Sequence, residues 1–160
     1  MSSSTAIAIS GNNTTTYDVS ATTKQFVTVI VDNQLFGIPV LTVQDVMRTP
    51  NIAQVPLARN EIHGLLNLRG RIVTAIDVRT RLKMYHTEAP ANTYNVVIEC
   101  GEELYSLLVD KVGDVMTLPT ERFEKNPANL EPNLREVASG VYKLKTDIMI
   151  VLDVDKLLTF

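Results

Sequence analysis

The sequence predicts a mainly β protein made of two pseudo-equivalent small barrels, each of about five strands, that pack on one another. Three observations support this prediction. The chain contains an internal repeat, its apolar runs are short and rich in β-branched residues, and those runs are bounded by Gly, Asn, Asp and Pro. Half of this chain would bury too little surface to be stable alone, so we expect the halves to pack together and leave a groove between them.

The internal repeat aligns two pairs of segments without a gap. Residues 25–47, QFVTVIVDNQLFGIPVLTVQDVM, align with residues 94–116, YNVVIECGEELYSLLVDKVGDVM. Residues 64–82, GLLNLRGRIVTAIDVRTRL, align with residues 140–158, GVYKLKTDIMIVLDVDKLL. Both copies are therefore expected to have the same order of elements.

Each copy is expected to begin with two strands and a turn, followed by a short VxDVM segment. The strands are FVTVIV and LFGIPV in the first copy, and YNVVIEC and LYSLLV in the second. The connections that follow differ in length. Residues 49–63 contain two prolines and are predicted to be extended, whereas NLREVAS, within residues 118–139, is predicted to form a short helix ended by Gly140.

Each copy is expected to end with a hairpin. Arg69-Gly70 between LLNL and IVTAI predicts a tight turn, because Gly70 is free to take a positive φ. Lys145-Thr146 stand at this place in the second copy and predict a tight turn less clearly.

Asp77 and Asp153 follow the last apolar strand of each copy. A carboxylate at this place caps a short helix that presents apolar residues four apart on one face. The alternative is an acid–base pair of carboxylates. We favour capping because each aspartate has the same local role within its own copy.

The charge of the chain is uneven. Residues 59–86 hold six basic and two acidic residues, a charge of +4. Since the net charge of the chain is −3, the other residues together carry −7. Such a window suits a nucleic acid, a phosphate or an acidic protein surface, and it also fits an ordinary solvated strand and helix face. Nucleic-acid binding is disfavoured, because Tyr85 is the only aromatic residue of the window and the acidic remainder repels a polyanion.

The sequence contains no recognisable catalytic, metal or cofactor motif. His63 and His86 have no metal-ligand spacing with Cys100 or with a pair of carboxylates. No phosphate-binding glycine motif or nucleophile-elbow motif occurs. The residues therefore show no catalytic constellation, and we do not expect a metal site. An anion-binding β-barrel and an enzyme with a dispersed active site both stay open.

Residues 1–24 differ from the rest of the chain. They are rich in Ser, Thr and Asn and lack the apolar stretch of a secretory signal, so we expect a flexible tail followed by a single domain over residues 25–160. One cysteine excludes an intrachain disulfide, and no apolar run approaches the roughly 18 residues of a membrane span. These features predict a soluble cytoplasmic protein.

The chain from Phe26 to Phe160 resembles the CheW-like family of chemotaxis coupling proteins. The resemblance is carried by FGIPVLTVQDVM, by the NLRG turn with the apolar strand and D-V-R ending that follow it, and by IVLDVDKLL. The same domain occurs in the regulatory part of the kinase CheA and in CheV. Because no kinase, dimerisation or receiver segment is left over in this chain, the resemblance favours a coupling protein.

The resemblance implies two SH3-like five-stranded barrels and a non-enzymatic adaptor. Such an adaptor joins the cytoplasmic tip of a methyl-accepting chemoreceptor to the histidine kinase CheA, within chemoreceptor arrays at the inner membrane and without inserting into it. The groove between the barrels is expected to take the receptor tip, and the end of one barrel is expected to dock on the CheA regulatory domain. Neither a nucleic acid nor a cofactor is implied.

The resemblance also implies particular contact residues. Those expected to bind the receptor are Arg69, Asp45 and Val43. Those expected to bind the kinase are Met47, Ile52, Val55 and Ile62. Arg69 serves either a salt bridge with Asp45, a partner, or both. The chain departs from the family where Asp45 replaces a glutamate and Thr74 replaces a proline.

Overall fold

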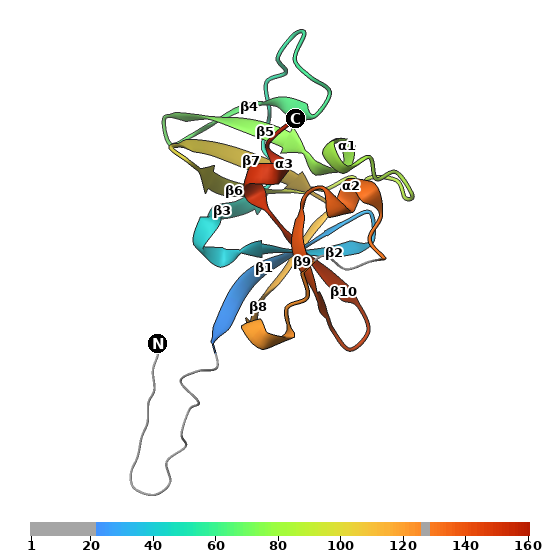
Figure 1. Ribbon diagram of the computed structural model, residues 1–160. Helices are drawn as coiled ribbons and strands as arrows, with labels where there is room; N and C mark the ends of the chain where they lie inside the picture. Colours follow the sequence, from blue (N-terminus) through green and yellow to red (C-terminus); the bar gives the residue numbers. More distant parts are fainter. Residues whose placement is uncertain (1–21, 126–128) are drawn as a thin grey trace, which may run out of the picture.

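The computed structural model describes residues 22–125 and 129–160 and contains two five-stranded sheets (Figure 1). The strands are β1 (Thr23–Val31), β2 (Gln34–Pro39), β3 (Val43–Arg48), β4 (Ile62–Leu68), β5 (Arg71–Asp77), β6 (Tyr94–Cys100), β7 (Glu103–Val109), β8 (Lys111–Pro119), β9 (Ala138–Lys143) and β10 (Ile148–Leu152). The helical turns are η1 (Val40–Thr42), α1 (Val78–Leu82), η2 (Thr120–Arg122), α2 (Pro132–Arg135) and α3 (Val154–Leu157). Residues 1–21 of the tail expected over residues 1–24 lie outside the described residues. Thr23 and Lys24, which were also assigned to the tail, belong to β1.

The sheets form two barrels that exchange strands between the copies of the repeat. Barrel 1 has the order β8-β1-β2-β10-β9 and barrel 2 the order β3-β6-β7-β5-β4. Barrel 1 takes β1 and β2 from the first copy and β8, β9 and β10 from the second. Barrel 2 takes β6 and β7 from the second copy and β3, β4 and β5 from the first. The chain crosses between barrels after β2, through η1, and after β7, at Asp110. The predicted mainly β fold with two barrels is confirmed, but a barrel is not one copy of the repeat.

Two aligned glycines let each barrel close. The segment after β3 bridges β4 through Ala53 and Leu65, and the segment after β8 bridges β9 in the same way. A Cβ on Gly64 would lie 2.4 Å from the carbonyl oxygen of Ala53, and one on Gly140 would lie 2.5 Å from that of Glu124. These close approaches explain why glycine stands at both places.

The predicted short helix forms at the start of NLREVAS, but it does not extend to Gly140. Helix α2 ends at Arg135, and β9 begins at Ala138, so Gly140 lies within a strand. Glycine is common at helix ends, but here it is required by the bridge to Glu124. The local rule was outweighed by a tertiary contact.

The predicted tight turn and the predicted helix caps are confirmed. Arg69 and Gly70 have φ values of 51° and 84°, as a two-residue hairpin requires, and Asn67 accepts a hydrogen bond from the Gly70 N–H. Asp77 and Asp153 accept hydrogen bonds from the backbone N–H groups at the third residue of α1 and α3. In the second copy, residues 144–147 form a longer loop between β9 and β10.

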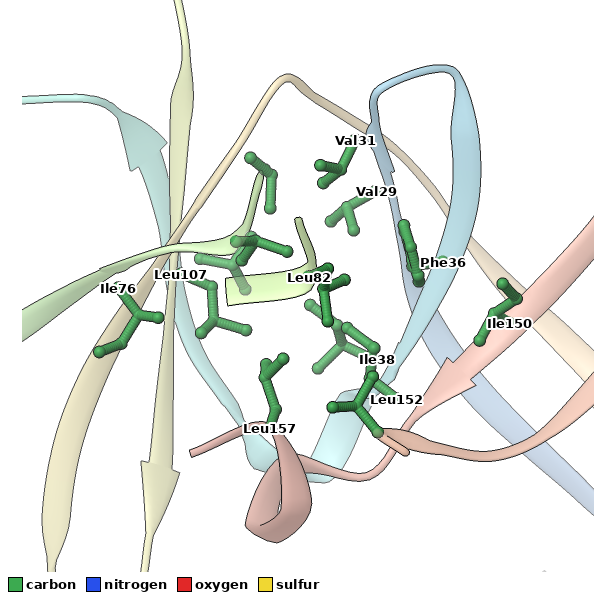
Figure 2. Close-up of a cluster of buried hydrophobic side chains, with 14 of the residues drawn as sticks. Val29, Val31, Phe36, Ile38, Ile76, Leu82, Leu107, Ile150, Leu152 and Leu157 are labelled. Carbon is green, nitrogen blue, oxygen red and sulfur yellow. The ribbon is translucent and has the colours of Figure 1, made fainter. Parts of the chain in front are cut away.

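A central core joins the barrels, and each barrel has an interior cluster of its own. Figure 2 shows the central core, to which barrel 1 contributes Val29, Phe36 and Ile150, barrel 2 contributes Ile76 and Leu107, and the helices contribute Leu82 and Leu157. The barrel 1 interior is formed by Phe26, Tyr142, Met149 and Val151. The barrel 2 interior is formed by Leu66, Val73 and Ala75. The largest cluster therefore belongs to neither barrel alone, which fixes their relative position.

Candidate functional site

Arg69 and Asp45 form an ion pair on the surface of barrel 2. The tight turn between β4 and β5 holds Arg69, and β3 holds Asp45, with 3.1 Å between Nη2 and Oδ2. The Arg69 side chain is 76% exposed and that of Asp45 is 28% exposed. The shorter Asp45 therefore still reaches the arginine. An exposed pair of this kind stabilises a fold by about 0–1 kcal/mol, so it can be exchanged for a partner's carboxylate at little cost.

Val43 and Leu41 lie at the first crossing between the barrels. Val43 begins β3 and packs half-buried against the central core. Leu41, in η1, is 93% exposed and was not singled out from the sequence. The repeat holds the signal that was missed, since the alignment places Leu41 opposite Asp110. Because only one of the two equivalent crossings exposes an apolar residue, Leu41 is a candidate for a contact outside the fold.

The four residues expected to bind the kinase do not form one exposed surface. Met47 is half-buried on β3, and Ile52 packs against the barrel 2 interior. Ile62 is half-buried and packs against the central core. Val55 alone is exposed, at 38%.

Next to Val55, the sequence analysis missed Leu57. Ala58 N–H donates to the carbonyl oxygen of Val55 at 3.3 Å, which closes a turn with Pro56 and Leu57 at its centre. Leu57 has a φ of 64° and is fully exposed. The left-handed conformation costs a non-glycine residue about 1–2 kcal/mol. An apolar side chain held out in this conformation is a candidate contact.

A buried ionic cluster at the second crossing was also missed. Arg79, in α1, donates from Nε and Nη2 to both carboxylate oxygens of Asp110, at 3.0 and 2.7 Å. Asp110 also accepts from the backbone N–H of Asp32, in the turn after β1. The Asp32 carboxylate in turn accepts from His86 and Thr87. The cluster therefore links barrel 1, α1 and the segment before β6.

The surroundings of this cluster favour the charged forms of Arg79 and Asp32. The hydrogen bond to Asp110 is the largest cause that raises the pKa of Arg79. Burial by itself raises the pKa of Asp32, but the hydrogen bonds from His86 and Thr87 outweigh it and hold that pKa well below its ordinary value. Removing one member would leave the others charged in a dry environment.

The basic window of residues 59–86 does not form a single basic surface. Arg79 is buried in its ionic cluster, and Arg69 pairs with Asp45. Arg81 donates to the last carbonyl oxygens of α3, including that of Leu157 at 2.7 Å. Arg59 pairs with Glu61 at 3.3 Å. Most of the positive charge of the window is thus engaged within the fold.

An open hollow of about 430 Å³ lies at the second crossing. It is lined by Pro90, Ala91, Asn92, Tyr94, Asp110, Lys111 and Val112. Val112 aligns with Val43 in the repeat, so each crossing carries an equivalent valine. None of the residues expected to bind the receptor lines this hollow.

Among the described residues, possible metal ligands do not cluster, and the single cysteine has a raised pKa. Residues 22–125 and 129–160 contain no group of three or more side chains placed to bind a metal ion. Cys100 donates to Asp155 at 3.0 Å, and this hydrogen bond, with burial, raises the pKa of the thiol to about 11. The thiol therefore stays protonated at neutral pH. Within the same residues, every helix is too short or too polar to cross a bilayer.

Comparison with known proteins agrees with the fold and with the motifs. The family model "CheW-like domain" matches residues 25–160. The chain is 28% identical to the chemotaxis protein CheW of Klebsiella aerogenes over 136 residues, which cover 85% of this chain and 82% of the relative. It is 23% identical to the chemotaxis protein CheW of Bacillus subtilis over 137 residues, or 86% and 88% of the two chains.

A solved structure supports the same fold. The scaffolding protein TtCheW of Thermoanaerobacter tengcongensis superposes with a TM-score of 0.79 at 22% identity, over 87% of this chain and 94% of that chain. At this identity the likeness concerns the fold, and the two-barrel SH3-like architecture is common to both. Because the family model matches most of the chain, the protein belongs to the CheW-like domain family.

Proposed function

We propose that this protein is a non-enzymatic adaptor that couples chemoreceptor tips to the histidine kinase CheA in bacterial chemotaxis. Membership of the CheW-like family supports a scaffold or adaptor role in chemotaxis signalling. The observation that best supports the finer proposal is the exposed ion pair of Arg69 and Asp45. It presents a guanidinium with donors to spare on a rigid two-residue turn.

The receptor surface consists of this ion pair together with Val43 and Leu41. A receptor tip is a helical hairpin, so it offers carboxylates and an apolar stripe on the same face. Arg69 would bind a carboxylate, and Leu41, being 93% exposed, would lose most of its water contact against the stripe. Val43 lies behind it, against the central core.

The kinase surface lies at the tip of the segment between β3 and β4. Val55 and Leu57 would make the contact, and Ile52 would support that segment from the barrel 2 interior. Met47, half-buried near the end of β3, would support the start of the segment. Ile62 lies deeper, so we assign it a supporting role in the central core. Because the exposed residues of the two surfaces belong to different segments, one molecule would bind both partners at once.

Two variants test this division. Arg69→Glu should abolish receptor-dependent control of CheA while leaving the affinity for the CheA regulatory domain within twofold, because the pair contributes little to stability. Val55→Asp with Leu57→Asp should weaken CheA binding at least about tenfold and leave receptor binding intact, because both side chains are exposed. Titration calorimetry and a reconstituted kinase assay measure these effects.

Lys145→Glu is the matched control. Lys145 aligns with Arg69 in the repeat, but it lies on barrel 1. It should affect neither partner. The proposal fails if folded Arg69→Glu couples receptor to kinase normally, or if the double aspartate variant binds CheA as the wild type does.

We also propose that the protein acts in the cytoplasm, with receptor arrays at the inner membrane, and without a nucleic acid or cofactor. The pairing of arginines within residues 59–86 supports the exclusion of a polyanion. Binding to a random single-stranded oligonucleotide that weakens steeply with salt would contradict it.

A further inference from the structure

Two polar side chains are buried next to each other in barrel 2. Asn95 on β6 and Ser106 on β7 are both completely buried, and Asn95 Nδ2 donates to Ser106 Oγ at 2.6 Å. Among the described residues, Asn95 Oδ1 has no hydrogen-bond partner. Exchanging the amide oxygen and nitrogen would leave the nitrogen unpartnered instead, so the amide is under-satisfied in either orientation.

The pair faces the barrel 2 interior. Val96 and Ile98 of β6 point to the central core, so Asn95 points the other way along the alternating strand. Ser106 lies beside Ala75 of the barrel 2 interior in the parallel register of β7 and β5. The unpartnered atom is therefore inside the barrel that carries both proposed partner surfaces.

Barrel 1 has an apolar layer at the equivalent place. The repeat aligns Asn95 with Phe26 and Ser106 with Gly37. Phe26 packs edge-on against Tyr142, with 5.6 Å between ring centroids. A Cβ on Gly37 would lie 2.7 Å from the Met149 methyl, so the glycine makes room for this packing. The polar layer is thus specific to barrel 2.

We propose that the Asn95–Ser106 layer is a built-in weak point, at which β3 and β6 separate locally while barrel 1 stays closed. A buried carbonyl without a partner is unfavourable in the closed state, and it regains a hydrogen bond as soon as water reaches it. Asn95 lies opposite Met47 of β3, which is the outermost strand of its sheet. Separation of β3 from β6 would therefore let water reach the Asn95 carbonyl while the other strand pairs of the sheet stay formed.

The weak point lies directly beneath a proposed interaction surface. β3 carries Val43, Asp45 and Met47, so its local opening lets these residues adjust to a partner. This functional consequence depends on the function proposed above, whereas the opening itself does not. Its test therefore needs no partner.

Backbone hydrogen exchange on the full chain tests the proposal. Amides of residues 95–98 in β6 should exchange at least about fivefold faster than those of residues 26–29, their equivalents in β1. Ser106→Ala removes the one partner of Asn95 and should widen this ratio. Asn95→Val combined with Ser106→Ala removes the polar layer and should bring the ratio close to one.

The two variants are expected to move the ratio in opposite directions, so the result does not depend on one of them alone. The proposal is overturned if β6 in the wild type is as protected as β1. It is equally overturned if neither variant changes the ratio. Either result would leave the proposed adaptor function standing, because no partner takes part in the measurement.

Discussion

The interiors of the two barrels show how a duplicated scaffold can divide its tasks. At three aligned positions barrel 1 has Tyr142, Met149 and Val151, where barrel 2 has Leu66, Val73 and Ala75. Every residue of barrel 2 is the smaller one. Barrel 1 also closes on an aromatic group in which Tyr142 contacts two phenylalanine rings.

Barrel 2, which has the smaller interior residues, has more of the proposed contact residues on its surface. Barrel 2 has the tight turn with Arg69 and the segment with Leu57, whereas barrel 1 has a longer loop at the place of that turn. The larger apolar interior thus belongs to the barrel with fewer proposed contacts. We infer that barrel 1 anchors the fold and barrel 2 supplies the interaction surface.

The largest expected effect concerns the ionic cluster that holds the barrels together. Arg79→Met should reduce the free energy of unfolding by about 3–5 kcal/mol, because the buried carboxyl groups of Asp110 and Asp32 would lose their cationic partner. Arg69→Met removes an exposed arginine–aspartate pair and is the matched control, with an expected loss below about 1 kcal/mol. Urea unfolding measures both. Similar losses in the two variants would contradict the distinction between them.

The two aligned glycines allow the barrels to be disturbed one at a time. Gly64→Ala and Gly140→Ala should each cost about 1–3 kcal/mol, because the added methyl group meets a backbone carbonyl. Gly64→Ala should also weaken CheA binding, since it displaces the segment that carries Val55 and Leu57. Calorimetric unfolding and titration with CheA distinguish the effects. Equal loss of CheA binding in both variants would contradict the assignment of that contact to barrel 2.

Acid should weaken the hydrogen bonds that Asp32, in the turn after β1, accepts from His86 and Thr87. The pKa of Asp32 is lowered in the folded protein from an ordinary 3.8. Its stabilising contribution is therefore complete above pH 3.8 and is lost as the pH falls from there towards the folded pKa. Urea unfolding between pH 6 and pH 3 should show this loss in the wild type and a shallower dependence in Asp32→Asn. An unchanged dependence in the variant would assign acid sensitivity to other carboxylates.

The smallest effect compares the ends of two aligned helices. Lys83 follows α1 with a φ of 57°, whereas Leu158 follows α3 in a right-handed conformation. Lys83→Gly should therefore raise the free energy of unfolding by about 0.5–1 kcal/mol. Leu158→Gly, without a positive φ to relieve, should not stabilise the protein. Thermal unfolding measures the difference, and destabilisation by Lys83→Gly would refute the argument.

Local sequence patterns predicted the features that depend on neighbouring residues. The tight turn at Arg69-Gly70 and the caps Asp77 and Asp153 follow from side chains within a few positions of the backbone they serve. The order of the elements followed from the repeat. The failure at Gly140 is instructive, because its nearest atoms come from Phe123 and Glu124 across the barrel.

Long-range features could not be predicted from the same patterns. An alignment of two copies is unchanged whether strands pair within a copy or between copies, so the strand exchange left no trace in it. Arg79 looked like one of several surface arginines, because Asp32 and Asp110 belong to distant turns. The pair of Asp45 and Arg69 was proposed from the sequence, but only the turn geometry decides whether the shorter side chain reaches.

The exchange of strands also governs what happens if the chain is cut. A single proteolytic cleavage between α1 and β6 would divide the chain into an amino-terminal and a carboxy-terminal fragment, each holding strands of both sheets and completing neither. Neither fragment contains a complete barrel that could fold alone, so the two fragments must fold together or stay unfolded. A nick at that place would therefore leave a non-covalent heterodimer, rather than two separable lobes.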